Sequence, residues 1–300
     1  MKKKTYLFAL MAMALTLGSC SDNENGIGGE TSKYITVSTS IGNMTRVATD
    51  EKGGQTFEEG DEISVYAWTG DATVAPETSE RVVNNAINKL TNGSWVSTPQ
   101  MLWKNNRDKH YFIGVYPISA ISDLSAGEYT FDETKQVESD LLVAVNKDGL
   151  SYNVDEQQPV PLTFTHVMAK LVVNLTYKNQ WGGIPTVEKV VVGNAAKEAT
   201  INYLTKVVTP STTAKEDFSL PEITENTKYV SVIIPQEDVK QLTIVIGGKN
   251  FVYDNGTPFK LESGKITTVN LEVGRDEIKL GDVKITNWED GSTFSGEALN

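Results

Sequence analysis

Apolar and polar residues alternate with a period of two along most of the chain from Tyr34 onward. β-branched and aromatic residues dominate these segments, and Gly, Asn, Asp and Pro bound them, which is the pattern of half-buried β-strands. Strands are predicted at Tyr34–Ile41, Glu62–Trp68, His110–Pro117, Leu141–Val145, Pro161–Phe164, Ala169–Tyr177, Val187–Val192, Tyr229–Ile234, Leu242–Ile246, Asn250–Tyr253, Ile266–Glu272 and Asp282–Trp288. Many short strands separated by turn residues indicate β-sandwiches. The chain is therefore predicted to be an all-β protein.

One segment, Arg81–Leu90, carries a helical stripe of apolar residues. A strand is the alternative prediction for this segment, because the Val-Val-Asn-Asn near its beginning is a poor start for a helix. Two hairpin turns are also predicted, at Gly247-Gly248 and at Ser263-Gly264, since glycine supplies the positive φ that tight turns need.

The first twenty residues have the features of a secretory signal: three lysines, an apolar run from Tyr6 to Leu17, and then Gly18, Ser19 and Cys20. The run is too short for a permanent membrane-spanning helix. The order Leu17 to Cys20 resembles the lipobox of bacterial lipoproteins, in which the leader is cut before the cysteine and the thiol is acylated. Cys20 is the only cysteine, and an ordinary signal residue with cleavage just after it is the alternative.

The sequence predicts a leader at 1–19, a polar, Gly-rich tether at 20–32, an N-terminal β-sandwich at 33–162 and a C-terminal β-sandwich at 163–300. The length of the mature chain favours two domains of about 150 residues each, with a single large β domain as the alternative. The junction is placed near Pro159–His166, where a polar loop passes into a second strand-rich half. With Cys20 lipidated, no thiol is left for a disulfide.

The formal net charge is −12, and loss of Lys2, Lys3 and Lys4 with the leader makes it −15. Such a surface repels nucleic-acid phosphates and anionic lipid headgroups, so neither is an expected partner. The acyl chain on Cys20 is the expected membrane anchor.

Residues that carry chemistry are sparse. His110 and His166 have no His or Cys neighbour at zinc-ligand spacing, and both are expected to be strand-edge or core histidines. No Gly-x-Ser-x-Gly motif occurs, and Gly264-Lys265 lacks the rest of a phosphate-binding loop. The acidic cluster Glu58–Glu62 is interpreted as a solvated turn, because it lacks the ligand pattern of a calcium loop. The sequence therefore predicts no enzyme, no cofactor and no metal site.

Tryptophan is the residue type that leaves a binding function open, because exposed indoles stack on sugars. Trp68 and Trp288 fit strand alternation and are predicted in the core. Trp95, Trp103 and Trp181 lie nearer loops and are candidates for a glycan platform.

Six sequence segments, taken together and in order, resemble the motifs of a known family. They are "FEEGDEISVYAW" at 57–68, "WKNNRDKHYFIGVYP" at 103–117, "SDLLVAV" at 139–145, "LTFTHVMAKLVVNL" at 162–175, "LESGKITTVNLEV" at 261–273 and "VKITNWEDG" at 283–291. The ordered set resembles the fimbrillin family of Bacteroides-type bacteria, the subunits of type V pili. Asp22 and Glu24 after the cysteine resemble the export signals of surface-exposed lipoproteins in those bacteria.

The resemblance implies two transthyretin-like β-sandwiches in a lipoprotein precursor that is displayed on the outer membrane and in fimbriae. It also implies that an arginine-directed protease removes the first strand, here by cutting between Arg46 and Val47. The first strand is Tyr34–Ile41, with Ile35, Val37 and Ile41 on one face and Thr39 in line with them. The opened groove would accept an extended strand from another fimbrillin subunit, because a donor both covers apolar surface and pairs free backbone groups.

The donor strand on this chain is placed at Ile278, Leu280, Val283 and Ile285. If Ile285–Trp288 is instead a fixed strand, only a polar tail remains, and a tip or anchor subunit is the better interpretation. A tip would bind a host or bacterial surface ligand. The competing hypothesis is a stand-alone surface lipoprotein that binds glycans through its loop tryptophans, and a hydrolase whose catalytic residues escape notice is a third.

Overall fold

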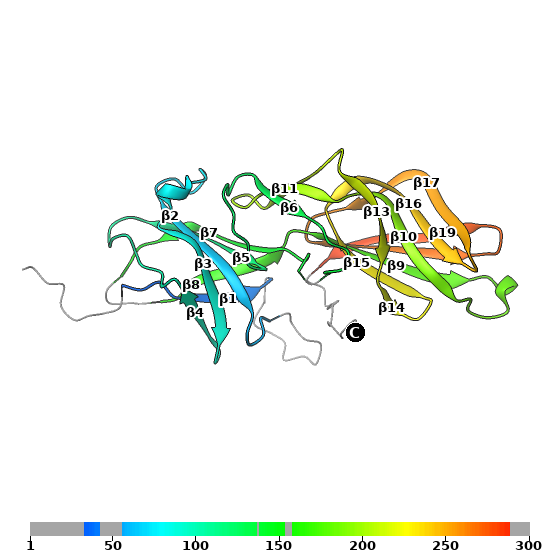
Figure 1. Cartoon of the computed structure of the whole chain (residues 1–300), viewed down its shortest axis with the longest axis horizontal. Helices are drawn as coiled ribbons and strands as arrows, with labels where there is room; N and C mark the ends of the chain where they lie inside the picture. The colour runs from blue at the N-terminus through cyan, green and yellow to red at the C-terminus, as the bar shows by residue number, and fades with distance from the viewer. Residues whose placement is uncertain (1–32, 43–55, 137, 154–157, 289–300) are drawn as a thin grey trace, which may run out of the picture. The chain divides into compact units, whose positions relative to one another are not determined.

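The computed structural model describes residues 33–42, 56–136, 138–153 and 158–288, and these residues belong to one compact unit. The described residues fold into four β-sheets (Figure 1). They also include two short 3-10 helices, η1 (Thr78–Glu80) and η2 (Asn179–Trp181). The prediction of an all-β protein is confirmed, while the assignment to two tandem transthyretin-like sandwiches stays a prediction. No helix among the described residues has both the length and the apolar character needed to span a membrane.

The first half of the chain builds a seven-stranded sheet. Its strands, from edge to edge, are β1 (Val37–Ile41), β8 (Val160–His166), β7 (Leu142–Leu150), β5 (His110–Tyr116), β2 (Glu62–Thr69), β3 (Val83–Thr91) and β4 (Ser94–Thr98). Neighbouring strands are antiparallel, except that β1 runs parallel to β8.

The stripe at Arg81–Leu90 belongs to strand β3 and not to a helix. Asn85 has φ 54°, and the pairing of β2 with β3 shifts register between Val65 and Ala67. This bulge moves the alternation by one residue, so that the buried Val83 and Ala86 are three positions apart. A spacing of three is the spacing of a helix face, which explains the ambiguity in the sequence.

The second half builds two further sheets. The four-stranded sheet has the order β13 (Lys215–Leu220), β10 (Val187–Ala196), β16 (Gln236–Ile246), β17 (Lys249–Leu261). The five-stranded sheet has the order β14 (Glu222–Thr224), β15 (Lys228–Ile233), β9 (Ala169–Tyr177), β18 (Lys265–Val273), β19 (Ile278–Asn287). Both predicted hairpin turns are present, with φ of 58° and 72° at Gly247 and Gly248 and 66° at Gly264.

A small three-stranded sheet joins segments from the two halves. It has the order β12 (Val207–Pro210), β11 (Glu198–Asn202), β6 (Gly127–Thr130), and β6 comes from the first half. Strand pairing passes from the seven-stranded to the five-stranded sheet between His166 and Ala169. The division into domains at 33–162 and 163–300 stays a prediction.

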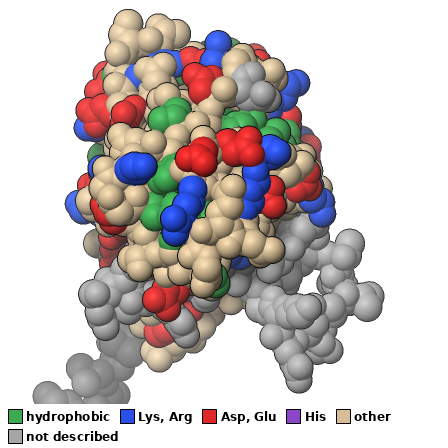
Figure 2. Space-filling model, turned by 90° about the vertical axis from the view of Figure 1, so that its right-hand side faces the viewer, with side chains coloured by type: hydrophobic (Ala, Val, Ile, Leu, Met, Phe, Trp, Pro, Cys, Tyr) green, Lys and Arg blue, Asp and Glu red, His purple; other side chains and the backbone are tan. Residues whose placement is uncertain are grey.

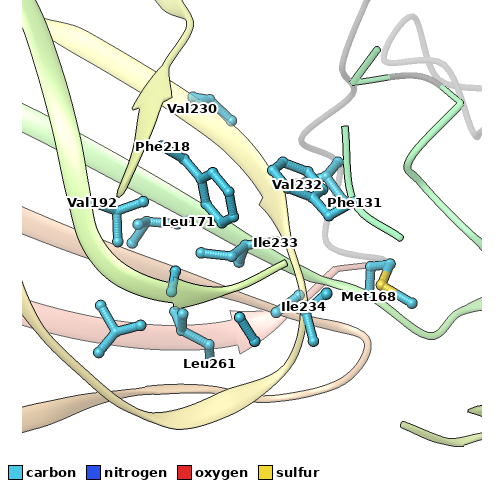
Figure 3. Packing of buried hydrophobic residues seen from close by; sticks show 14 of the residues in the cluster. Phe131, Met168, Leu171, Val192, Phe218, Val230, Val232, Ile233, Ile234 and Leu261 are labelled. Atoms are coloured by element: carbon cyan, nitrogen blue, oxygen red, sulfur yellow. The ribbon is translucent and has the colours of Figure 1, made fainter. Parts of the chain in front are cut away.

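Two hydrophobic cores hold these sheets. The larger one includes residues from both halves, and in it Phe131 meets Phe218 edge to face with ring centroids 4.9 Å apart (Figure 3). Trp68 and Trp288 are buried in this core, as the alternation predicted. The smaller core lies within the seven-stranded sheet and includes Ile35 and Val37 from the N-terminal segment. The first strand is therefore part of a core and not a peripheral addition.

The surface mixes charges of both signs. On the face shown in Figure 2, acidic and basic side chains are interspersed with small groups of hydrophobic ones. That face therefore carries no broad patch of a single charge, although the net charge of the chain is −12.

Candidate functional site: the channel of the first strand

The N-terminal segment is hydrogen-bonded to two partners, first to residues 101–103 and then to β8. On one side the N–H of Ile35 donates to Met101 O (2.9 Å) and the N–H of Trp103 donates to Lys33 O (3.2 Å). On the other side the N–H of Val160 donates to Thr36 O (2.8 Å) and the N–H of Gly42 donates to Phe164 O (2.8 Å). The segment thus lies in a channel, called here the β1 channel, that is bounded by the stretch 101–103 beside residues 33–35 and by β8 beside residues 36–42.

The side chains of this segment alternate as the sequence predicted. Ile35 is 1% exposed and Val37 6% exposed, and Thr39 and Ile41 are half-buried on the same face. The floor beneath them includes Met101, Phe112, Leu162 and Phe164. Full burial of an Ile or Val side chain contributes about 1.5–3 kcal/mol, so this face supplies much of the attachment of the segment.

Aromatic residues close the channel beside Thr39. The indole N–H of Trp95, on β4, donates to Thr39 Oγ1 at 3.0 Å. Phe57 packs edge to face against Trp95, Tyr116 and Phe164, with ring centroids 5.3, 5.4 and 5.1 Å apart respectively. Because β4 and β1 are the two edges of the seven-stranded sheet, these contacts bring the edges together around the smaller core.

The arrangement can bind an extended strand without any reactive group. If the first strand left, backbone groups of β8 and of residues 101–103 would lose their partners and the smaller core would be uncovered. Unpaired edge groups beside apolar surface are a template for another strand. The predicted processing residues Arg46 and Val47 and the predicted lipidation site Cys20 lie outside the described residues, and these assignments stay predictions.

The predicted donor residues lie on β19, in a different sheet from β1. β19 is antiparallel to β18, from the pair Lys265 and Asn287 to the pair Val273 and Ile278. Ile278 and Leu280 are half-buried against the larger core, whereas Val283 and Ile285 are 40% and 39% exposed. Ile285–Asn287 is part of the paired strand, which matches the alternative of a fixed C-terminal strand. A donor role for these residues stays a prediction.

A cluster of ring and charged groups lies where β8 ends. The imidazole of His166 stacks on the indole of Trp288, and His166 Nδ1 lies 2.8 Å from Asp140 Oδ1. The ammonium of Lys170 lies 5.4 Å from the centroid of the Trp288 ring. Burial lowers the pKa of Lys170 from 10.5 to about 8, because a charged ammonium is disfavoured away from water. Sequence reasoning missed this cluster, although "VKITNW" placed Trp288 in the core.

Both histidines are buried, as the sequence predicted. His110 Nε2 accepts the N–H of Lys104 at 3.0 Å, so the ring is neutral with its proton on Nδ1, 3.0 Å from Asp108 O. Burial also lowers the pKa of His110, which favours this neutral form. Within the described part of the chain, no group of His, Cys, Asp and Glu side chains is arranged to hold a metal ion.

The loop tryptophans are half-buried rather than open. Trp103 packs edge to face on His110 and Phe112, with ring centroids 4.9 and 5.7 Å apart. The indole N–H of Trp181 donates to Val273 O at 3.0 Å. A cavity of about 790 Å³ lies beside Trp103, and its lining includes Trp68, Asp71 and Arg81. This cavity therefore has the indole of Trp103 in its lining.

The model of the fimbrillin-like family matches residues 45–288 of this chain. The chain belongs to the fimbrillin-like family. This is a structural, non-enzymatic family, so the predicted resemblance and the prediction of a non-enzymatic protein are both confirmed. The match begins after β1 and ends at Trp288.

Three other proteins similar to this fimbrillin-like chain are a curated relative and two solved structures. A candidate fimbrium subunit of Bacteroides uniformis, Fim1C, is 25% identical, and the alignment covers 97% of each protein. The crystal structure of a candidate cell adhesion protein from Bacteroides uniformis has a TM-score of 0.63 at 18% identity, covering 85% of this chain and 98% of that one. A fimbrial protein from Bacteroides vulgatus has a TM-score of 0.53 at 11% identity, covering 84% and 99%. The two structures show a shared fold.

Proposed function

We propose that this fimbrillin-like protein is a subunit of cell-surface fimbriae that receives a strand from a neighbouring subunit in the β1 channel. The observation that carries the proposal is that the first strand pairs with residues 101–103 at its start and with β8 along residues 36–42, over a core to which it contributes Ile35 and Val37. The candidate cleavage site, Arg46, follows the last described residue of that segment, Gly42, by four positions. Cleavage there would separate the strand from the rest of the chain while leaving it bound.

The direction of β1 supports replacement of this strand by a strand from another subunit. β1 runs parallel to β8, whereas the other strand pairs of its sheet are antiparallel. Parallel pairing is slightly weaker per residue than antiparallel pairing. An incoming antiparallel strand would therefore form better hydrogen bonds with β8 than the strand it replaces, and burial of its apolar side chains would drive the exchange.

We assign the protein to a terminal position, as a tip or anchor, rather than to the repeating stalk. β19, which holds the predicted donor residues, is paired along its length with β18, and Trp288 after it is 3% exposed. Donating this strand would expose Trp288 and break the ladder. The polar stretch after Trp288 has only Phe294, Ala298 and Leu299 as apolar residues, so it is a poor donor by itself.

The proposed location is the outer membrane surface, with the acyl chain on Cys20 as the anchor of the precursor. Two hydrophobic signals are normally needed for stable anchoring, and the multiple acylation of a lipoprotein cysteine would supply them. The test is the N-terminal residue of the protein recovered from cells. Acylated Cys20 identifies the anchored precursor, and free Val47 identifies the processed subunit.

The assembly experiment treats the purified precursor with an arginine-specific protease and then adds a second fimbrillin with a free extended terminus. We expect one heat-sensitive complex on gels run without boiling, and no ladder when the protein is treated alone. Arg46→Ala should abolish the complex. Arg107→Ala is the matched control, because Arg107 lies in an exposed loop outside the channel. Identical processing and assembly of Arg46→Ala and the unmodified chain would reject strand exchange, and a self-ladder would indicate a stalk subunit.

The second candidate function is glycan binding at the cavity beside Trp103. Its support is the joint presence of an indole, a carboxylate and a guanidinium in the cavity lining, at Trp103, Asp71 and Arg81. The unprocessed monomer should then bind a polysaccharide, and Trp103→Ala should abolish binding. Trp95→Ala is unsuited to this test, because Trp95 bonds to Thr39 and its loss would disturb the β1 channel.

A further inference from the structure

Strand β19 forms one edge of the five-stranded sheet, and no strand of the described structure pairs with its outer side. It has ten residues and contains no proline. A long edge with unpaired N–H and C=O groups is a template for another strand. The side chains along β19 therefore decide which strand it can take.

The free backbone groups of β19 belong to the residues that carry its exposed apolar side chains. The N–H of Trp288 donates to Gly264 O at 3.1 Å, so these two residues form a hydrogen-bonded pair of the antiparallel ladder. Such pairs alternate with pairs that exchange no hydrogen bond. Counted back along the register, Lys284 is hydrogen-bonded to β18. The N–H and C=O groups of Val283 and Ile285 point away from β18, toward the free edge.

The same two residues leave apolar surface open on the inner face of the sheet. Val283 and Ile285 lie opposite Val269 and Thr267 of β18, which are both buried. Val283 and Ile285 themselves are 40% and 39% exposed. A strand added at this edge would cover their side chains while it bonds to their backbone groups.

On the outer face, a row of polar side chains crosses the sheet and ends at the free edge. Asn174 of β9 donates to Asn270 Oδ1 of β18 at 2.7 Å, and Asn270 donates to Asp282 Oδ1 of β19 at 2.5 Å. Lys284 lies two positions along from Asp282 on the same face. It is exposed and makes no hydrogen bond or ion pair with any described residue. The row thus ends in a carboxylate next to an unpaired ammonium.

A second, antiparallel copy of β19 matches both of these charges. If Val283 pairs with Val283 of the second copy, Asp282 of each chain lies opposite Lys284 of the other, so a two-fold axis creates two opposite-charge pairs. These would be non-hydrogen-bonded pairs of the new ladder, in which facing side chains come closest. The neighbouring registers would place Lys284 opposite Lys284 or Asp282 opposite Asp282, which is destabilising. The charges therefore select one register.

We propose that β19 is the contact surface of a symmetric dimer, in which two copies of this chain pair antiparallel about Val283 and join their five-stranded sheets into one. Asp282 and Lys284 fix the register, and Val283 and Ile285 supply the apolar contact. One strand from each copy gives a smaller contact than the interfaces of about 1,200–2,000 Å² in stable complexes, so the dimer dissociates on dilution. The pairing needs neither the β1 channel nor removal of the first strand.

The test measures the molecular mass of the chain over a range of concentrations by analytical ultracentrifugation. The chain begins at residue 20, which keeps every residue that the structure describes. Cys20→Ser is present throughout, so that neither an acyl group nor a disulfide links two copies. We expect an equilibrium between monomer and dimer. A chain that stays monomeric at every concentration would overturn the proposal.

Charge reversal locates the contact. Lys284→Asp should raise the dissociation constant of the dimer at least about ten-fold, because two opposite-charge pairs become two like-charge pairs. Lys260→Asp is the matched control, since it changes the net charge equally and Lys260 is exposed on β17, an edge strand of the four-stranded sheet. Asp282→Lys should weaken the dimer in the same way. A mixture of Lys284→Asp and Asp282→Lys should form the dimer again, because each mixed pair joins a lysine to an aspartate, and this recovery requires both variants to be folded.

Val283→Pro tests the backbone pairing. The N–H of Val283 faces away from β18, so proline breaks no hydrogen bond within the sheet but removes both N–H donors at the two-fold axis. We expect the dimer to be lost while the far-UV circular dichroism spectrum is kept. The charge variants decide the question even if this variant fails to fold. A dimer that keeps its dissociation constant in Lys284→Asp uses another surface and would overturn the proposal.

Discussion

The imidazole of His166 lies flat on the indole of Trp288, with the ring centroids 4.2 Å apart and the ring planes 8° from parallel. His166 is the last residue of β8, and Trp288 directly follows β19. This contact joins the strand that pairs with β1 to the strand that holds the predicted donor residues. The strand that pairs with β1 is therefore in contact with the residue that follows β19.

Trp288→Ala should lower the free energy of unfolding by about 3–5 kcal/mol, because it leaves a cavity in the larger core and removes the stacked ring. Trp288→Phe keeps most of the stacked area and should lower the free energy of unfolding by a smaller amount. Equilibrium urea denaturation followed by far-UV circular dichroism measures both. Equal losses for Ala and Phe would show that the stacked ring contributes little.

Ile35→Ala should destabilise the attachment of the first strand by about 2–5 kcal/mol, since Ile35 is 1% exposed over the smaller core. Ser38→Ala is the matched control, because Ser38 lies on the exposed face of the same strand. Hydrogen exchange of the β8 amides reports the attachment. The prediction fails if both variants protect the Val160 amide, which donates to Thr36 O, as well as the unmodified chain does.

Gly114→Ala should destabilise the floor of the β1 channel by about 1–3 kcal/mol through overpacking. A Cβ at Gly114 would lie 2.6 Å from Phe164 Cζ and 3.1 Å from Leu162 Cδ1, and Phe164 is fully buried. Gly193→Ala is the control, because its Cβ would meet the end of the flexible Gln241 side chain. Adding Phe164→Leu to Gly114→Ala should recover part of the loss. Urea denaturation that finds Gly114→Ala as mild as Gly193→Ala would contradict the geometry.

Lys170 should make stability rise with pH above neutrality. Its pKa is about 8 in the fold and 10.5 ordinarily, so between these values the unfolded chain binds a proton that the folded protein does not. Raising the pH through this window stabilises the fold by ~2–3 kcal/mol, and that stability is lost as the pH falls through 8.

Lys170→Met lacks this dependence, so the stability of the unmodified chain relative to this variant should increase from pH 7.5 to pH 10. Comparing the two chains cancels the opposing contribution of buried tyrosines such as Tyr116, whose pKa burial raises to about 12. Urea denaturation at each pH makes the comparison. If the free energies of unfolding of the two proteins change with pH in the same way, the pKa of Lys170 is not lowered by burial.

Local alternation predicted the strands that have one apolar face. The strand Ala169–Tyr177 was predicted at its observed bounds, and the burial of Ile35 and Val37 followed from the same pattern. Short strands such as β12 and β14 were missed, because segments of four and three residues are too short to show a period of two. At β3 a bulge displaced the alternation by one residue, and the local pattern could not distinguish it from a helix.

The sequence by itself determined the class of fold, the core faces of its longer strands and the family. Alternation and short family motifs are both patterns of residues that are neighbours in the sequence. The tertiary structure alone decided that the first strand pairs in parallel with β8, since Ser40 and Thr163 are 123 positions apart and no local signal selects that partner. It also decided that His166, Lys170 and Trp288 meet. Such contacts depend on how strands from distant parts of the chain pack against one another. The free energy of that packing depends on the whole chain and not on any single segment.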